Sequence, residues 1–237
     1  MNDYEFDFAG YANEDITNPE PVEDIMSQFD NTPKGKFTKA FSNIKREGAD
    51  DLFKFLEDNG FFDAPASTKY HGDFKGGLCV HSLNVYWNLH DELRQLFGKD
   101  YTNRYSDETI AIVSLLHDVC KIDKYIETEK NVKNQETGQW ELKKCFDYNK
   151  NQPRLGHGSS SVYMIMDYMK LTLEEKQAIH WHMGPFDLSA YESTYDMGDA
   201  FNKNTLAFAL HIADMTATYI DENEYFKPIE GDCDDCC

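Results

Sequence analysis

Apolar side chains recur at helical spacing along most of the chain between residues 33 and 222. Residues three and four positions apart share one face of a helix, so each such stretch predicts an amphipathic helix with one buried stripe. The predicted helices cover residues 34–47, 49–60, 77–98, 106–121, 160–170, 172–183 and 204–222. A succession of helices of this kind predicts an all-α fold.

Local signals mark where several of these helices begin and end. Thr32 stands before a proline, and Ser106 stands before a first turn that holds two acidic residues, and both are typical N-cap positions. Thr172 and Glu175 have the spacing of a capping box, in which the side chains and backbone at a helix start bond reciprocally. Gly98 is placed to end the long helix before it.

Two stretches depart from the helical pattern. Residues 124–148 look like a β-hairpin, with two flanks around the glycine-containing turn sequence NQETGQ. Residues 184–203 are rich in Tyr, Asp and Gly and are predicted to form a polar loop. The expected architecture is one helical domain over residues 32–222, a helical bundle with a small β-hairpin insertion.

The charge of the chain is uneven. The net charge is −20, and residues 1–30 hold nine acidic and no basic side chains. Residues 221–237 hold seven acidic residues and one lysine. Segments 1–31 and 223–237 are therefore predicted to be acidic, flexible tails outside the domain. Such a field repels long nucleic acid, while a small anionic ligand held locally stays compatible.

The location predicted from the sequence is cytoplasmic. Hydrophobic residues make up 41% of the chain, yet none of the apolar runs reaches the roughly 18 residues of a membrane span. The first residues, MNDYEFDFAGY, lack the basic and apolar regions of a signal peptide. We expect a cytoplasmic protein, or one of the host cytoplasm if a phage encodes it, with no membrane partner.

The six cysteines do not predict a zinc site. Cys79, Cys120 and Cys145 stand singly in patterned segments and are expected to be small core residues. Cys233, Cys236 and Cys237 form a C-x-x-C with a neighbour, which lacks the second pair that a tetrahedral zinc site needs.

Side chains that commonly bind metals interrupt the apolar stripes. They are His81, His117 with Asp118, His180 with His182, and His211 with Asp214, and His157 stands at a further helix start. One buried histidine is usually a hydrogen-bonded core residue. Several such intrusions fit a shared cause better, because an unpaired buried carboxylate costs several kcal/mol and one cation can satisfy the whole group.

The types of ligand narrow the choice of metal. Imidazole and carboxylate without thiolate favour Mn, Fe, Co, Ni or Mg over structural zinc, although zinc stays compatible. His117 and Asp118 are adjacent, and adjacent residues of a regular helix point about 100° apart. They can reach one ion only near a helix end, and the sequence VCKID that follows Asp118 supplies such an end.

The order His81, His117-Asp118, Asp214 resembles the H…HD…D signature of the HD-domain metal-dependent phosphohydrolase superfamily. HDVCK matches the HDxxK variant of that signature, and His157 and His182 fall where members with a second metal carry additional histidines. The resemblance covers roughly residues 48–222. It is nearest to bacterial and phage HD hydrolases and to 3′-to-5′ exoribonucleases with HD domains.

The resemblance implies an enzyme with one or two divalent ions. It assigns one ion to His81, His117, Asp118 and Asp214, and a second ion to His157 and His182 with Asp118 as the bridge. Asp118 and Lys121 are then the catalytic residues. The pattern departs from the family at His180-Trp181-His182, where two-metal members often have adjacent histidines. We therefore expect His182 to be the ligand, and expect His180 and His211 not to be.

The resemblance also implies a phosphorylated substrate. We expect hydrolysis of a phosphomonoester or phosphodiester bond of a small nucleotide. The candidate substrate-binding residues are Lys69, His71, Lys121, Arg154 and Trp181. Two alternatives stay open: a 3′-to-5′ exonuclease acting on short single strands, and a non-catalytic regulatory module that binds a metal or a nucleotide. A homo-oligomer is compatible with the sequence.

Overall fold

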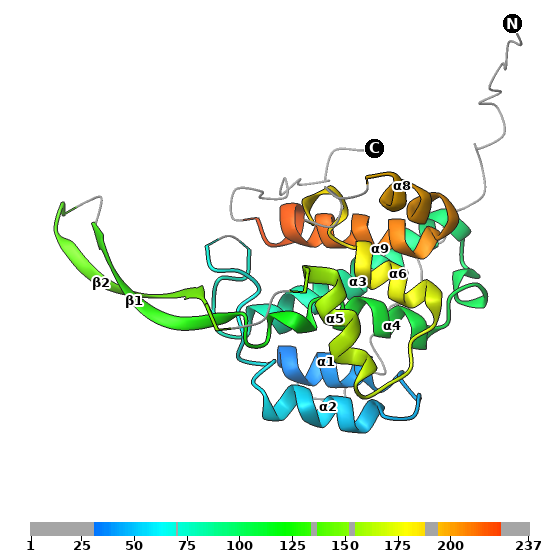
Figure 1. Ribbon diagram of the computed structural model, residues 1–237, viewed down its shortest axis with the longest axis horizontal. Coiled ribbons are helices and arrows are strands. Elements are labelled where there is room, and N and C mark those ends of the chain that lie inside the picture. The colour runs from blue at the N-terminus through cyan, green and yellow to red at the C-terminus, as the bar shows by residue number, and fades with distance from the viewer. Residues whose placement is uncertain (1–30, 70, 134–136, 152–154, 188–193, 224–237) are drawn as a thin grey trace, which may run out of the picture.

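A computed structural model describes residues 31–69, 71–133, 137–151, 155–187 and 194–223. The fold is mostly helical with one small two-stranded antiparallel sheet, and the two strands project away from the helices (Figure 1). The predicted acidic tails lie almost wholly outside the described residues, as do Arg154 and the three cysteines of the C-terminal segment. None of the described helices combines the length and the apolarity needed to cross a membrane.

The described part of the chain contains eight α-helices and two strands. The helices are α1 Pro33–Phe41, α2 Ala49–Asp58, α3 Gly77–Phe97, α4 Asp107–Leu116, α5 His157–Met166, α6 Leu173–Trp181, α8 Thr194–Lys203 and α9 Thr205–Thr216. Short 3₁₀ turns lie at η4 Tyr101–Asn103, η5 Val119–Lys121 and η6 Gly184–Phe186, and a π-helical turn, η7 Ala217–Asp221, extends α9. The strands are β1 Tyr125–Lys133 and β2 Trp140–Tyr148.

The local signals at the helix starts are confirmed. Thr32 Oγ1 accepts a hydrogen bond from the Gly35 backbone at 3.1 Å, and Ser106 caps α4 in the same way. At α6, Thr172 and Glu175 form both bonds of the capping box. These contacts satisfy backbone N–H groups that have no partner inside the helix, and each is made by a side chain within three residues of the group that it caps.

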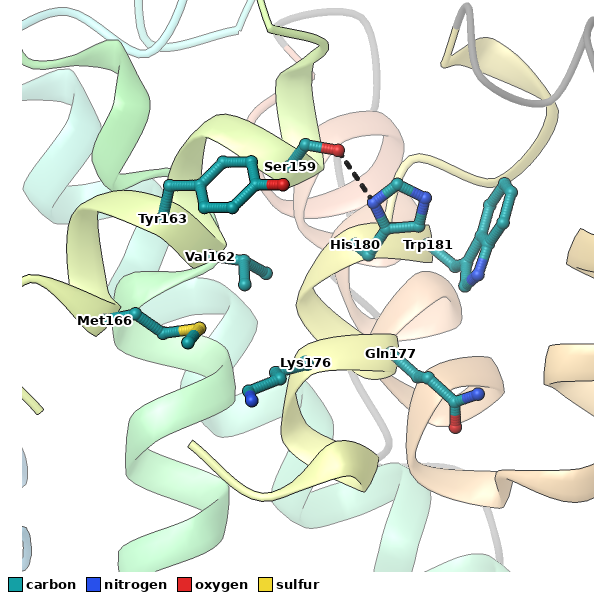
Figure 2. Close-up of a pocket in the computed structure, with 8 residues that line it drawn as sticks. All are labelled: Ser159, Val162, Tyr163, Met166, Lys176, Gln177, His180 and Trp181. Carbon is teal, nitrogen blue, oxygen red and sulfur yellow. Dashed lines mark hydrogen bonds between the residues drawn. The ribbon is translucent and has the colours of Figure 1, made fainter. Parts of the chain in front are cut away.

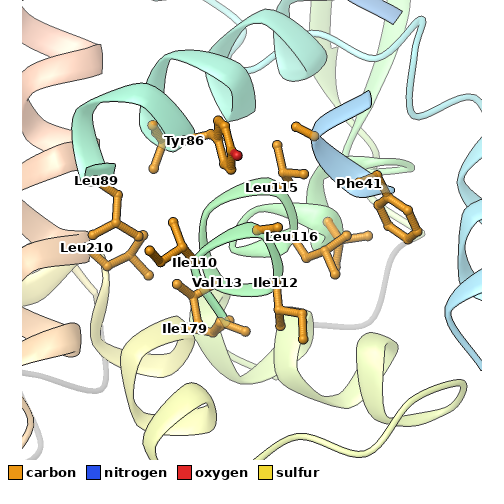
Figure 3. Close-up of a cluster of buried hydrophobic side chains, with 14 of the residues drawn as sticks. Phe41, Tyr86, Leu89, Ile110, Ile112, Val113, Leu115, Leu116, Ile179 and Leu210 are labelled. Carbon is orange, nitrogen blue, oxygen red and sulfur yellow. The ribbon is translucent and has the colours of Figure 1, made fainter. Parts of the chain in front are cut away.

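Helix α4 is the centre of the hydrophobic core. Every residue from Ile110 to Leu116 is buried, so α4 is covered on all sides, which is typical of a helix inside a bundle. Figure 3 shows its side chains spread toward neighbours such as Tyr86 of α3, Ile179 of α6 and Leu210 of α9. Each fully buried aliphatic side chain stabilises the folded state by about 1.5–3 kcal/mol, compared with the same side chain left exposed to water.

The hairpin prediction is confirmed, whereas the prediction of a loop is wrong over residues 194–203, and residues 188–193 lie outside the described residues. Strands β1 and β2 pair antiparallel, with Tyr125 opposite Tyr148 at the base. The supposed loop contains η6 and the helix α8. Its composition favours a turn, but Ala200 is buried and Phe201 packs edge-on against Phe208 of α9, so tertiary contacts stabilise the helix.

We expect Ile112→Ala to lower the free energy of unfolding by about 2–5 kcal/mol, because it leaves a cavity in the middle of α4. Ile112 is 0% exposed, whereas Leu173 is 72% exposed and provides the matched control. Leu173→Ala should change stability by less than about 0.5 kcal/mol. Urea denaturation followed by circular dichroism measures both, and equal effects would contradict the core assignment.

Candidate metal centre

Five helices bring their ligand-type side chains to one buried point. His81 lies in the first half of α3, His157 is the first residue of α5, and Asp214 lies near the end of α9. His117 and His182 are the C-cap residues of α4 and α6. His81, His117, His182, Asp118 and Asp214 are all buried, and His157 is half-buried.

The end of α4 allows adjacent residues to face the same centre. The helix stops at Leu116, and Asp118 has left the helical conformation with φ −109° and ψ 14°. The next residues form the 3₁₀ turn η5. Because the helical rotation is broken between them, His117 Nε2 and Asp118 Oδ2 lie only 3.4 Å apart. The predicted helix end is therefore confirmed.

One oxygen of Asp118 faces the first group of candidate ligands. Asp118 Oδ2 lies 3.5 Å from His81 Nε2 and 3.4 Å from His117 Nε2. His81 Nε2 in turn lies 3.3 Å from His117 Nε2 and 3.2 Å from Asp214 Oδ1. Ligand atoms bound about 2.0–2.2 Å from a shared ion at tetrahedral or octahedral angles are about 2.8–3.6 Å apart. The observed separations fall within this range, so the group could hold a metal ion.

The hydrogen bonds made by the Nδ1 atoms of His117 and His182 also favour a metal site. His117 Nδ1 lies 2.7 Å from the Ser114 carbonyl oxygen, and a carbonyl can only accept, so Nδ1 carries the proton. The Nε2 lone pair of His117 then points at the centre. His182 repeats this arrangement, with Nδ1 2.6 Å from the Ile179 carbonyl oxygen. Metal-binding histidines typically have their tautomer fixed by such a bond on the other ring nitrogen.

The other ring nitrogen of His182, Nε2, is a buried polar atom. It has no hydrogen-bond partner among the described residues, and its nearest charged neighbour is Asp118 Oδ1 at 3.5 Å. A buried acceptor without a partner costs roughly 1–3 kcal/mol, and a cation between the two atoms would remove that cost. This orphaned nitrogen is independent support for an ion on the Oδ1 side.

His157 closes the Oδ1 side differently. Its Nε2 lies 2.5 Å from Asp118 Oδ1, a direct hydrogen bond, while its Nδ1 lies 3.0 Å from Lys124 Nζ and 3.3 Å from Cys120 Sγ. Burial outweighs its charged neighbours and lowers the pKa of His157 to about 4, so the ring is neutral at pH 7. Each oxygen of Asp118 therefore has one short contact, Oδ1 with His157 and Oδ2 with Lys121 Nζ at 2.6 Å, and an ion on either side would replace that contact.

Glycines set the distance between the helices that carry these histidines. A Cβ on Gly158 would lie 2.2 Å from the His180 carbonyl oxygen, so only glycine lets α5 approach α6 this closely. A Cβ on Gly184 would collide with the ring of His211 at 2.6 Å. His211 Nδ1 lies 2.6 Å from the His182 carbonyl oxygen, a contact through which His211 supports that segment.

The carboxylates of the cluster are ionised, and they stabilise positive charge on neighbouring side chains. Burial would raise the pKa of the Asp118 carboxyl, but Lys121 Nζ, 2.6 Å from Oδ2, holds it well below its usual range. The pKa of Asp214 is also lowered against the effect of burial, through its bond with His81. Burial disfavours a charged His81, yet Asp214 and Glu222 raise its pKa to about 10. A divalent cation would compete with that proton for Nε2.

Four residues near the centre were not predicted as site residues. Glu222 Oε1 lies 3.0 Å from His81 Nδ1, and Asn84 donates to the same oxygen at 2.9 Å. Lys124 and Cys120 contact His157, as described above. Cys120 is buried, as predicted, but as part of a group with Asp118 and His157 that could hold a metal. Cys79 is buried as well, and Cys145 is half-buried.

The candidate substrate-binding residues lie at different places. Lys121 is 6% exposed and bound to Asp118, so it lies inside the cluster. His71 is half-buried, with its ring centroid 5.1 Å from that of His81. Lys69 is exposed on the loop before it, and Arg154 lies outside the described residues.

Trp181 lines a separate cavity between α5 and α6. The cavity has a volume of about 370 Å³ and is bounded by residues that include Tyr163, Met166 and Lys176. Figure 2 shows His180 in the same wall, with its Nδ1 3.1 Å from Ser159 Oγ. His180 thus points away from the histidine that follows it by two positions, as expected for residues about 200° apart on a helix.

Comparisons with protein-family models, with curated proteins and with solved structures found no match. The buried His and Asp cluster is compatible with the resemblance to the HD-domain superfamily. The evidence for that resemblance therefore consists of the ordered ligands and the geometry of the cluster itself.

We expect Glu222→Gln to weaken binding of Mn²⁺ about 10-fold to 100-fold, because an amide orients His81 less strongly than a carboxylate does. Isothermal titration calorimetry with Mn²⁺ measures the change. Asp221→Asn is the matched control, since Asp221 is the exposed neighbour and accepts a hydrogen bond from Asn88 on the surface. Equal affinity of wild type and Glu222→Gln would show that this carboxylate does not support the site.

Proposed function

We propose that the protein is a metal-dependent phosphohydrolase of the HD-domain type that cleaves a phosphomonoester or phosphodiester bond of a small nucleotide. The observation that carries the proposal is the position of Asp118. Its Oδ2 faces the imidazoles of His81 and His117, and its Oδ1 faces those of His157 and His182. A carboxylate with an imidazole pair on each oxygen is suited to bridge two divalent ions.

The donor atoms favour particular metals. His81, His117, Asp118 and Asp214 would hold one ion, and His157, His182 and the other oxygen of Asp118 a second. Imidazole and carboxylate donors suit Mn, Fe, Co, Ni and Mg, and zinc is compatible. Such ions supply a Lewis acid and a bound water of lowered pKa for attack on phosphorus. Burial raises the pKa of the Cys120 thiol to about 11, so the thiol carries its proton at pH 7 and would have to lose it to bind an ion.

Lysines next to the cluster would bind and orient the phosphoryl group. Lys121 Nζ already contacts Asp118, and Lys124 Nζ contacts His157. Asp118 and Lys121 remain the residues to which we assign the catalytic roles. The side chains of His157, Asp214 and Lys121 are 13%, 9% and 8% exposed, so these partly open side chains would be accessible to a substrate. The ring of His71 lies beside the ring of His81, where His71 is placed to contact the part of the nucleotide beyond the phosphoryl group.

Charge favours a small substrate over a long one. The net charge of −20 opposes the approach of polyanions, whereas a nucleotide needs only the local field of the two lysines. Because one mononucleotide carries few charges, the repulsion from the acidic surface is modest and is screened within about 10 Å at ordinary ionic strength.

We expect Asp118→Ala to lower hydrolysis of nucleotides and generic phosphodiesters at least 1,000-fold in the presence of Mn²⁺, and to lower bound metal, because both ion positions lose a ligand. Circular dichroism should show an unchanged helical fold. Asp123→Asn is the control, since this exposed residue lies on the same segment, five positions along the chain, and should keep full activity.

The outcomes separate the alternatives. Unchanged turnover in Asp118→Ala with metal still stoichiometric would refute the assignment. Full metal content in the wild type without turnover of any phosphoester would instead indicate a non-catalytic binding module. Turnover of short single strands that falls steeply with salt would indicate the exonuclease.

A further inference from the structure

Cys120 lies at the edge of the metal centre, with its thiol beside side chains that commonly bind metals. It stands in η5, two residues after Asp118, and is 5% exposed. Its Sγ lies 3.3 Å from His157 Nδ1. One ligand atom each of Asp118, Cys120 and His157 lie within 4.8 Å of one another, whereas Cys79 belongs to no such group within the described residues. Cys120 is thus buried as predicted, but its thiol is part of a possible ligand set.

The spacing of this group allows one ion to bind all three side chains. Zinc lies about 2.3 Å from a thiolate sulfur and about 2.0–2.1 Å from an imidazole nitrogen, so at a tetrahedral angle two such ligand atoms are about 3.5 Å apart. Because the three atoms already lie within 4.8 Å of one another, shifts of about 1 Å would bring them into place. The main shift separates His157 Nε2 from Asp118 Oδ1, whose direct contact the ion would replace.

His182 indicates an ion at the same carboxylate oxygen, independently of the cysteine. Its Nε2 lies 3.5 Å from Asp118 Oδ1, its side chain is 0% exposed, and this nitrogen has no hydrogen-bond partner among the described residues. With His182 as the fourth donor, the Oδ1 side of Asp118 offers one oxygen, one sulfur and two nitrogens. Four donors of these types are the number that a tetrahedral zinc site needs.

We propose that the Cys120 thiolate is a ligand of the ion on the Oδ1 side of Asp118, which makes this position selective for an ion that binds sulfur well, such as Zn²⁺. The Oδ2 side has imidazole and carboxylate donors without sulfur, which suit harder ions such as Mn²⁺. The centre would then hold two different metals. The inference rests on the metal centre of the proposed function but does not depend on hydrolysis.

Charge balance supports a thiolate at this position. When the ion binds, the S–H bond of Cys120 breaks, a metal–sulfur bond forms, and the proton leaves to solvent, because a metal ion displaces the proton of a thiol that binds it. The thiolate adds its negative charge to that of Asp118 and lowers the cost of placing a divalent ion in a buried site. The opposing charge is that of Lys124, whose Nζ lies 3.0 Å from His157 Nδ1. Lys124 is half-buried beside the exposed Asp123, so its ammonium group can turn toward solvent.

Cobalt spectroscopy of the full chain tests the ligand directly, because Co²⁺ can replace Zn²⁺ and absorbs in the near ultraviolet when a thiolate binds it. Cys233, Cys236 and Cys237 are replaced by serine in every sample, so that the C-terminal cysteines do not bind the probe. We expect a thiolate-to-cobalt charge-transfer band and its loss in Cys120→Ser. Cys79→Ser is the matched control and should keep the band, because Cys79 is also buried but lies in α3.

Metal selectivity gives a second measurement. We expect Cys120→Ser to weaken Zn²⁺ binding at least about 10-fold, because loss of a partner that only supports a ligand already costs about 10-fold to 100-fold. Binding of Mn²⁺ should change little, since that ion does not favour sulfur. Isothermal titration calorimetry with each metal measures both. Cys120→Ala is a second variant with the same expectation, and circular dichroism checks that each variant keeps the helical fold.

The outcomes separate this inference from the proposed function. Bound Co²⁺ without the charge-transfer band would overturn the thiolate ligand and leave the metal centre of the proposed hydrolase in place. A band that persists in Cys120→Ser, or that Cys79→Ser removes equally, would overturn the inference too, as would an unchanged affinity of Cys120→Ser for Zn²⁺. A band that depends on Cys120, in a protein that turns over no phosphoester, would support the ligand and count against hydrolysis alone.

Discussion

The buried carboxylate of Asp118 is the interaction around which the ligand-type side chains of the centre are arranged. The residue is 1% exposed and ionised, which would cost several kcal/mol without compensation. Lys121 bonds one oxygen at 2.6 Å, and imidazoles from four other positions surround both oxygens. His117 and Lys121 belong to the same segment as Asp118, whereas His81, His157 and His182 come from α3, α5 and the end of α6, so the full set of partners forms only when these helices are assembled. Stability and the candidate chemistry thus share one cause.

Helices α4 and α6 show how the bundle brings histidines to Asp118. At their N-terminal ends, Arg46 joins Glu175 at 2.7 Å and Glu108 at 3.3 Å, while Thr109 donates to Glu175 at 3.2 Å. Glu175 is buried and is also the partner of Thr172 in the capping box, so one carboxylate caps α6 and joins it to α4. At the opposite ends of the two helices lie His117 and His182, each bound to the carbonyl three residues earlier. The two helices present equivalent histidines because they are fixed at the same end.

The β1–β2 hairpin and the candidate metal centre are neighbours along the chain. The helix that supplies His117 stops, a single 3₁₀ turn carries Lys121, and β1 begins four residues later at Tyr125. The break in helical geometry that lets His117 and Asp118 face one point also redirects the chain out of the bundle. The hairpin is thereby joined directly to the segment that bears Lys121 and Lys124.

Sequence by itself determined the local features of this protein. Helix starts at Thr32, Ser106 and Thr172 follow from side chains that bond their own backbone within three residues, and the hairpin follows from its turn. The intrusion of His81, His117, Asp118 and Asp214 into apolar stripes was also visible, because burying such groups has a cost wherever they fold. Their order along the chain suggested one shared ion.

Only the tertiary structure decided which polar groups meet. Glu222 is 141 residues from His81, and nothing near it in the sequence distinguishes it from the exposed Asp221. Helix α8 forms where composition favours a loop, because Ala200 and Phe201 find apolar neighbours. Spacing along the chain sets the conformation of one turn, whereas a contact across a hundred residues depends on how whole helices pack. That packing is a balance of many small contacts, which single residues do not reveal.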